Sequence, residues 1–193
     1  MYGTAVKIIG YHGTYPEWID SIKENNFKES VNHDIWLGDG VYFFIDGISI
    51  TPPSELAAQF AIDQCYNKET KAYDKEEVCV IKAAVRLNED KSLDLTQDKG
   101  YQLFNMFRDK VISSIEFVGK KPVTPYRDVD VFKVMRQELG IEFVKSNLYI
   151  KFAVQRIGRF ESNIPNVTVL VVNNPAKNIQ KPSIQVILKK GVK

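Results

Sequence analysis

The sequence predicts an α+β fold that forms one domain over residues 1–193. Apolar runs typical of strands lie near both ends of the chain, and stretches with apolar residues at helical spacing lie between them. The chain has 193 residues, of which 44% are hydrophobic and 26% charged, as in an ordinary globular protein. This length gives one domain enough apolar residues for a sizeable core.

The first half of the chain is expected to alternate strands and helices. Residues 6–9 are β-prone and begin the fold with a strand. A first helix begins at Pro16, because proline is tolerated at the first helical position. A polar loop follows, in which His33 is expected to be solvated and to have no catalytic part. A second helix is expected over residues 52–65, and a buried strand over residues 78–87.

The second half begins with two helices and ends with strands. Helices are expected over residues 101–112 and 128–139, each with an apolar stripe on one face. Asp128 is expected to cap the second of these helices, and Gly140 to end it. Besides a short edge piece at 93–95, strands are expected at 148–152, 167–172 and 184–188.

The sequence indicates a protein of the cytoplasm. Its N-terminus lacks the basic patch and apolar stretch of a signal peptide, and no apolar run approaches the about 20 residues of a membrane span. Cys65 and Cys79 have neither the spacing of a metal site nor that of a disulfide framework. Both are therefore expected to be buried free thiols in a reducing compartment. We expect neither a bound metal nor contact with a membrane.

Three short motifs in the first third of the chain carry the functional signal. They are Gly-Tyr-His-Gly-Thr at residues 10–14, Trp-Leu-Gly-Asp-Gly-Val-Tyr-Phe-Phe at residues 36–44, and Ala-Ala-Gln-Phe at residues 57–60. The first two place His12 and Tyr42 near glycines, where the missing Cβ is expected to let a ligand approach the backbone. An imidazole on a strand, bare backbone amides and an aromatic face suit a flat heteroaromatic amide joined to a sugar, such as nicotinamide riboside.

The order and spacing of these motifs resemble the ADP-ribosyltransferases of the diphtheria-toxin and poly(ADP-ribose)-polymerase branch. The resemblance implies a split mixed β-sheet with helices packed around it, NAD as co-substrate and a His-Tyr-Glu triad. His12 matches the triad histidine, which hydrogen-bonds the ribose, and Gly13 matches the glycine whose backbone holds the carboxamide. Thr14 completes the motif in the NAD-binding region. Tyr42 matches the triad tyrosine that stacks on nicotinamide, and Phe60 the second ring of that sandwich.

The chain departs from the family pattern at two positions. Gln185, at the start of a late strand, aligns with the triad glutamate, and Glu161 is a weaker alternative for that place. An amide can bond ribose hydroxyls but cannot take up a proton, so transfer of a single ADP-ribose is expected rather than synthesis of a long polymer. Ala57 stands where the family commonly has a serine that bonds the carboxamide. The loss of that bond is expected to cost about 1 kcal/mol of affinity.

The C-terminal part of the chain is strongly basic. From Lys145 onward nine basic residues oppose one acid, a net charge of +8, which leaves −6 for residues 1–144 out of the total of +2. Arg156, Arg159 and Phe160 lie in this part, where cations alternate with aromatic residues. Such a pattern suits a single strand of nucleic acid, whose phosphates bind cations and whose bases stack on rings. We therefore expect a nucleic-acid acceptor, with RNA ahead of DNA.

The resemblance and the charge together indicate a mono-ADP-ribosyltransferase that modifies a macromolecule, such as a bacterial toxin or a phage-defence effector with a neutralising antitoxin. A protein acceptor is the alternative to nucleic acid. A pseudoenzyme that binds NAD without transfer is a second alternative, because glutamine replaces glutamate. The related RNA 2′-phosphotransferases also open with His-Gly-Thr. They need further arginines and a histidine in the second motif, where this chain has Tyr-Phe-Phe at residues 42–44.

Overall fold

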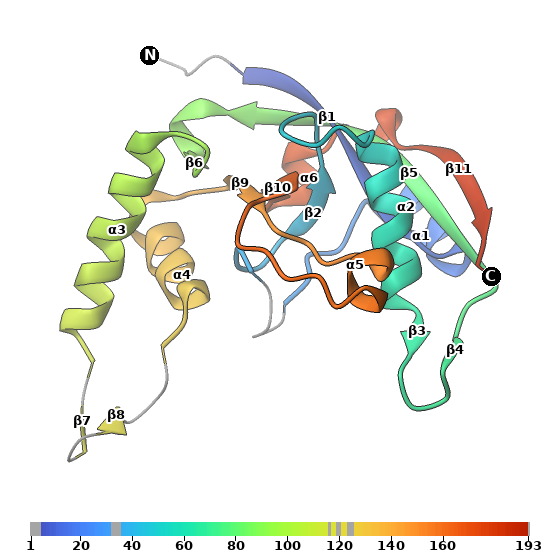
Figure 1. Ribbon diagram of the computed structural model, residues 1–193. Coiled ribbons are helices and arrows are strands. Elements are labelled where there is room, and N and C mark those ends of the chain that lie inside the picture. The colour runs from blue at the N-terminus through green and yellow to red at the C-terminus, as the bar shows by residue number, and fades with distance from the viewer. Residues whose placement is uncertain (1–4, 32–35, 116, 119–120, 123–125, 193) are drawn as a thin grey trace.

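A computed structural model describes residues 5–31, 36–115, 117–118, 121–122 and 126–192. The predicted solvated loop histidine, His33, lies outside these residues. Within them the chain is α+β, with helices packed around a mixed seven-stranded sheet (Figure 1). None of the helices in the described ranges is long and apolar enough to cross a membrane.

The sheet has the strand order β11-β5-β1-β2-β10-β9-β6. Neighbouring strands are antiparallel except β6 and β9, which are parallel and make the sheet mixed. The strands are β1 (Ala5–Thr14), β2 (Val41–Phe44), β5 (Glu77–Asn88), β6 (Ser92–Asp94), β9 (Phe143–Leu148), β10 (Val167–Val172) and β11 (Gln185–Gly191).

Helices and two small hairpins complete the described structure. The hairpins pair β3 (Tyr66–Asn67) with β4 (Ala72–Tyr73) and β7 (Phe117–Val118) with β8 (Lys121–Pro122). The helices are α1 (Ile19–Asn25), α2 (Pro53–Gln64), α3 (Asp98–Ser113), α4 (Asp128–Leu139), α5 (Ala153–Ile157) and α6 (Pro175–Asn178), with 3-10 turns at Pro16–Trp18, Glu89–Lys91 and Lys181–Ser183.

Each face of the sheet has its own hydrophobic core. On one face, here called the first face, α2 packs on β1 and β5, and α3 packs beside α4 toward β6 (Figure 1). Its core includes Phe44, Ala57, Phe104, Phe132 and Val169. The second face carries α1 and α6, and its core includes Ile19, Phe27, Phe43, Ile81 and Phe143. Both faces are covered, so the central strands β5 and β10 are buried almost throughout.

The ladder between β1 and β2 is interrupted in the middle of the sheet. β1 pairs with β5 over its whole length, from Ala5↔Asn88 to Thr14↔Cys79. With β2 it is in register only at Tyr11↔Phe44. Immediately after this pair, the side chain of His12 bridges to the backbone of β2. The sheet therefore parts where the first two sequence motifs meet.

Most of the predicted elements are confirmed by the structure, including the helices near residues 53–64 and 128–139 and the strands at 78–87 and 167–172. Gly140 ends α4 with φ 66°, as predicted. Asp128, however, is the first residue of α4 rather than its cap. The cap is Arg127, whose backbone N–H donates to the Asp130 carboxylate over 2.9 Å.

The predicted strand at 148–152 is wrong. The observed strand β9 precedes it, and its pairing with β10 ends at Val167↔Leu148. β9 is held between β10 on one side and β6 on the other, so these two partners set its limits. Ile150 and Phe152 are apolar because they cover the first face from a loop, where both are buried.

Candidate functional site

A small cavity of about 50 Å³ lies where β1 and β2 part. Residues from all three sequence motifs line it, among them His12, Gly13, Tyr42 and Phe60. These are four of the five residues predicted to bind NAD. The fifth, Thr14, is buried beside Cys79 and is not among the lining residues. The fold thus brings together side chains that are up to 48 residues apart in sequence.

His12 is held by the backbone of the neighbouring strand. Its Nδ1 atom lies 2.8 Å from the carbonyl oxygen of Tyr42, so Nδ1 carries the proton that this oxygen accepts. The ring lies edge-on to Phe27, with the centroids 5.3 Å apart, and 5.9 Å from the ring of Phe43. Burial in this apolar surrounding lowers the pKa of His12. The neutral imidazole therefore keeps a lone pair on Nε2, which can accept a hydrogen bond from a hydroxyl group.

Gly13 is required by the packing of helix α2. A Cβ at this position would lie 2.1 Å from the carbonyl oxygen of Ala57. The expectation that the missing Cβ makes room for a ligand is therefore wrong, because the helix backbone fills that space. A ligand can therefore bind only at the edge of the Gly13 backbone. Gly13 is in register with Val80 on the β5 side, and no described residue of β2 is in register with it on the other.

Tyr42 ties its strand to the glycine-containing turn before it. The phenol donates to the Gly38 carbonyl over 2.8 Å and accepts from the Leu37 backbone N–H over 3.0 Å. Burial raises the pKa of Tyr42, so the phenol stays protonated and keeps both bonds. The turn needs glycine at two places, since Gly38 has φ 79° and Gly40 has φ 141°. These contacts fix the orientation of the Tyr42 ring in the cavity wall.

Phe60 and Trp36 close the cavity from the first face. The ring of Phe60, on α2, lies 5.8 Å from that of Phe44 and 6.2 Å from that of Trp36, edge to face in both cases. Trp36 is 48% exposed, so it can turn outward without unpacking the core. Sequence reasoning placed Trp36 in the second motif but assigned it no role. Its aromatic side chain two residues before Gly38 is the signal that was available.

Gln185 does not reach this cavity. It pairs with Lys82 of β5, which in turn pairs with Tyr11, so two strand spacings of roughly 10 Å in total separate Gln185 from β1. Directly paired residues share a face of the sheet, and successive residues alternate, so His12 projects from the opposite face. Gln185 is exposed. The strand order therefore leaves Gln185 two strands from His12 and three strands from Tyr42.

Glu161 also lies away from the cavity. Its side chain is 89% exposed and forms a loose ion pair with Lys151 over 3.7 Å. It borders a separate hollow with Tyr149 and Ser162. Among the described residues, no acidic side chain lines the cavity at His12. Within that described lining, an oxocarbenium-like cation formed here would find no carboxylate to stabilise it.

Asp63 is an acidic residue near this region that sequence reasoning missed. It lies one helical turn beyond Phe60 on α2, and its Oδ2 atom is buried without a partner among the described residues. Burial raises its pKa, while the positive charge of Arg156 opposes this rise. It was overlooked because nothing in the sequence near Asp63 shows that α5 would fold against this turn.

The three predicted acceptor-binding residues lie on the surface, outside the cavity. Arg156 is on α5 and Arg159 just after it, and both are exposed. Phe160 is 58% exposed. Arg156 borders a hollow of about 490 Å³ beside the end of α2, together with Asp63, Lys68, Tyr66 and Tyr73. Cations and aromatic rings gather at this hollow, but Lys68, Tyr66 and Tyr73 come from outside the basic segment that begins at Lys145.

Arg136 is a second residue that the sequence did not single out. It lies on α4 behind the turn at residues 38–40, and a Cβ on Gly38 would lie 3.3 Å from its Nη1 atom. Its Nε and Nη2 atoms are buried without a partner among the described residues. Burial lowers its pKa, but the negative charges of Asp39 and Glu29 favour the charged form. Arg136 therefore supplies a positive charge close to the Tyr42 phenol.

The two cysteines and the charged clusters do not form a further centre. Cys65 and Cys79 are buried free thiols, and burial raises the pKa of both, which makes them poor nucleophiles. Within the described part of the chain, no group of three or more metal-ligating side chains comes together.

Comparison of the chain with protein-family models and with curated proteins finds no match.

Proposed function

We propose that this chain is an NAD-dependent mono-ADP-ribosyltransferase with the split-sheet fold of that family. The observation that carries the proposal is the convergence of His12, Gly13, Tyr42 and Phe60 on one cavity. Three separate sequence motifs supply them, at the point where β1 and β2 part. The resemblance is based on sequence order alone, so the meeting of these residues in space is an independent observation that supports it.

The residues present suit the nicotinamide end of NAD. The backbone edge of Gly13 can bond the carboxamide, and the Tyr42 and Phe60 rings offer aromatic faces to the pyridinium. The lone pair on Nε2 of His12 can accept a hydrogen bond from the ribose. The cavity of about 50 Å³ is far smaller than the about 300–1,000 Å³ of typical ligand pockets. Entry of the nicotinamide ring therefore requires Trp36 to turn outward.

The reaction breaks the bond between the pyridinium nitrogen and C1′ of the ribose. The bonding electron pair stays on that nitrogen, and neutral nicotinamide leaves. A nucleophilic nitrogen or oxygen of the acceptor forms the new bond to C1′ and releases its proton to solvent. Catalysis then depends on how well the protein orients the ribose and stabilises the cationic transition state.

A second candidate is a protein that binds NAD without transferring ADP-ribose. The specific observation in its favour is that no acidic side chain lines the cavity among the described residues, and that Gln185 lies two strands away. Two measurements on the same protein distinguish NAD binding from ADP-ribose transfer. Isothermal titration with NAD detects binding in either case, whereas release of free nicotinamide occurs only if the glycosidic bond is cleaved.

The proposed acceptor is nucleic acid, with RNA ahead of DNA. The +8 charge from Lys145 onward supports it, as do exposed Arg156, Arg159 and Phe160. A protein acceptor is the alternative. On this proposal the protein acts in the cytoplasm as a bacterial toxin or phage-defence effector, and a neutralising antitoxin is its expected partner.

The experiment that tests this function uses NAD labelled with ³²P in its adenylate phosphate. Purified protein is incubated with RNA, single-stranded DNA or a protein lysate, and each product is digested with nuclease or protease. Label bound to RNA and released by ribonuclease is expected, and it is expected to disappear in His12→Ala. Label that only protease releases would show that the acceptor is a protein and not nucleic acid. No label in any fraction and no nicotinamide release would overturn the transferase.

A further inference from the structure

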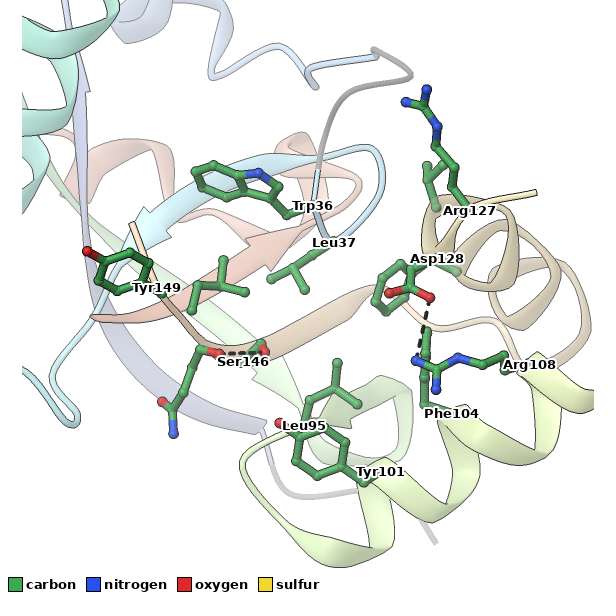
Figure 2. A pocket seen from close by; sticks show the side chains of 14 residues that line it. Trp36, Leu37, Leu95, Tyr101, Phe104, Arg108, Arg127, Asp128, Ser146 and Tyr149 are labelled. Atoms are coloured by element: carbon green, nitrogen blue, oxygen red, sulfur yellow. Dashed lines mark hydrogen bonds and ion pairs between the residues drawn. The ribbon is translucent and has the colours of Figure 1, made fainter. Parts of the chain in front are cut away.

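A hollow on the first face lies between α3, α4 and β9. Its volume is about 540 Å³, within the about 300–1,000 Å³ typical of sites for small ligands. Figure 2 shows Trp36 and Tyr149 on one side of it and Tyr101 and Phe104 on the other. Four aromatic side chains from three separate segments thus surround one space.

A cation lies at the rim of this hollow. Arg108 projects from α3 over the ring of Phe104, with its guanidinium carbon 4.8 Å from the ring centroid. Its ion pair with Asp128 is long, at 3.5 Å, and both side chains are largely exposed. Such a pair contributes little, so a phosphate can compete with the Asp128 carboxylate for Arg108. Rings below and a cation at the edge suit a base that carries a phosphate.

The hollow shares one aromatic wall residue with each of two other hollows. Trp36 lines both this hollow and the cavity at His12. Tyr149 lines both this hollow and the next one, where Lys151 follows. Five residues further along the same β9–β10 connection, Arg156 borders the hollow at the end of α2. The connection therefore presents an aromatic residue and then two cations, each at the wall of a hollow.

We propose that the hollow between α3, α4 and β9 seats one base of a single-stranded nucleic acid whose backbone follows residues 149–156. The base stacks among Trp36, Tyr101 and Tyr149, and Arg108, Lys151 and Arg156 bind phosphates. The wall shared at Trp36 places this base next to the proposed ribosyl donor. This inference rests on the proposed function and names a binding site for its acceptor. Duplex is excluded, because a paired base cannot enter the hollow.

Direct binding measurements test this site without NAD. Fluorescence anisotropy of a labelled eight-nucleotide single-stranded RNA is compared with that of the same DNA sequence and of a duplex. The test variant is Tyr101→Ala, which removes a half-exposed ring from α3. The matched control is Met106→Ala, on the same helix, 59% exposed and not a lining residue. Circular dichroism confirms that both variants are folded.

Tyr101→Ala is expected to weaken binding of the single strand by about five- to a hundred-fold, the range for one stacked base. Met106→Ala is expected to change it less than two-fold. Arg108→Gln should lower the slope of log K against log salt by about 1, whereas Lys99→Gln, on the same helix but outside the hollow, should not. Nicotinamide release from NAD without acceptor should stay unchanged in Met106→Ala.

Three results would overturn this inference. One is no measurable binding of any single strand, and another is equal affinity of Tyr101→Ala and Met106→Ala. The third is an unchanged affinity for the oligonucleotide in Tyr101→Ala together with a raised KM for NAD, which would assign the hollow to the adenylate half of NAD. If the proposed transferase function is wrong but this binding site is right, the results differ from these three. The single strand then still binds at Tyr101, but NAD releases no nicotinamide.

Discussion

The Nδ1 atom of His12 lies 2.8 Å from the carbonyl oxygen of Tyr42, across the gap where β1 and β2 part. One side chain thus replaces the strand-to-strand hydrogen bonds that stop at Tyr11↔Phe44. The same bond determines which ring nitrogen is protonated, and so leaves Nε2 as the acceptor for a substrate hydroxyl. The structural and the proposed chemical role of His12 therefore depend on a single contact.

His12→Ala is expected to lower NAD consumption by about 100-fold or more, the scale on which lost substrate positioning acts. The measurement is nicotinamide release, with thermal melting to show that the variant is folded. His12→Gln, which keeps a hydrogen-bonding group of similar reach, replaces it if the alanine variant does not fold. Full activity in either folded variant would remove His12 from the site.

Tyr42→Phe is expected to destabilise the fold while leaving an aromatic face for nicotinamide. The variant loses the bonds to Gly38 and Leu37. It leaves the Gly38 carbonyl and Leu37 N–H without their partner, which costs about 1–3 kcal/mol of the free energy of unfolding. Urea unfolding measures this loss. An unchanged free energy of unfolding would show that the turn at residues 36–40 does not depend on the phenol.

Gly13→Ala is expected to lower the free energy of unfolding. An overpacked core typically costs about 1–3 kcal/mol, and the loss here should be at least that large. The added methyl group would lie 2.1 Å from the Ala57 carbonyl oxygen, and neither β1 nor α2 is free to move away. Gly158→Ala is the matched control. Its added Cβ would lie 3.3 Å from its nearest neighbour, the carbonyl oxygen of Val154, at the exposed end of α5. Equal melting temperatures for the two variants would contradict this packing.

Gln185→Ala is expected to leave NAD consumption within about two-fold of the wild-type value. Gln185 is exposed at the start of β11, with the whole of β5 between it and β1. Loss of stacking or positioning at the cavity is not expected over two strand spacings, roughly 10 Å. The assay is again nicotinamide release, with Glu161→Ala alongside. A loss as large as that of His12→Ala would return Gln185 to the triad.

The acid stability of the fold is expected to depend on Glu142. Burial raises its pKa, but hydrogen bonds from Lys177, Lys91 and Asn178 outweigh this and bring the pKa to about 2. A lowered pKa contributes stability above the unfolded value near 4.5, and the contribution is lost as pH falls toward 2. Its size at pH 7 is roughly 3 kcal/mol, from the shift between these two values.

Glu142→Gln should therefore lose this stability at pH 7, and its difference from the wild type should shrink between pH 4.5 and pH 2. Urea unfolding over this range measures both. Glu161→Gln is the control, because that side chain is 89% exposed. A difference that stays constant over the range would mean that the carboxylate of Glu142 does not act through its charge.

The pattern of apolar residues and the turn residues in the sequence were enough to predict the class of the fold and most of its elements. The helix from Pro53 and the end of α4 at Gly140 follow from local rules that need no partner. The apolar run over residues 167–172 predicted a strand, and the structure places it in the interior of the sheet. The three motifs also identified residues that do meet in space, because their glycines and rings mark unusual backbone.

Only the tertiary structure decided which partner each of these residues contacts. The space beside Gly13 belongs to α2, because a helix from residues 53–64 docks there. The position of Gln185 depends on the order of strands, which places β5 between β11 and β1. Trp36 reaches the site from a loop, and Asp63, on α2, is covered by α5. Strand order and helix docking depend on contacts between distant parts of the chain, and hydrophobic periodicity describes only one element at a time.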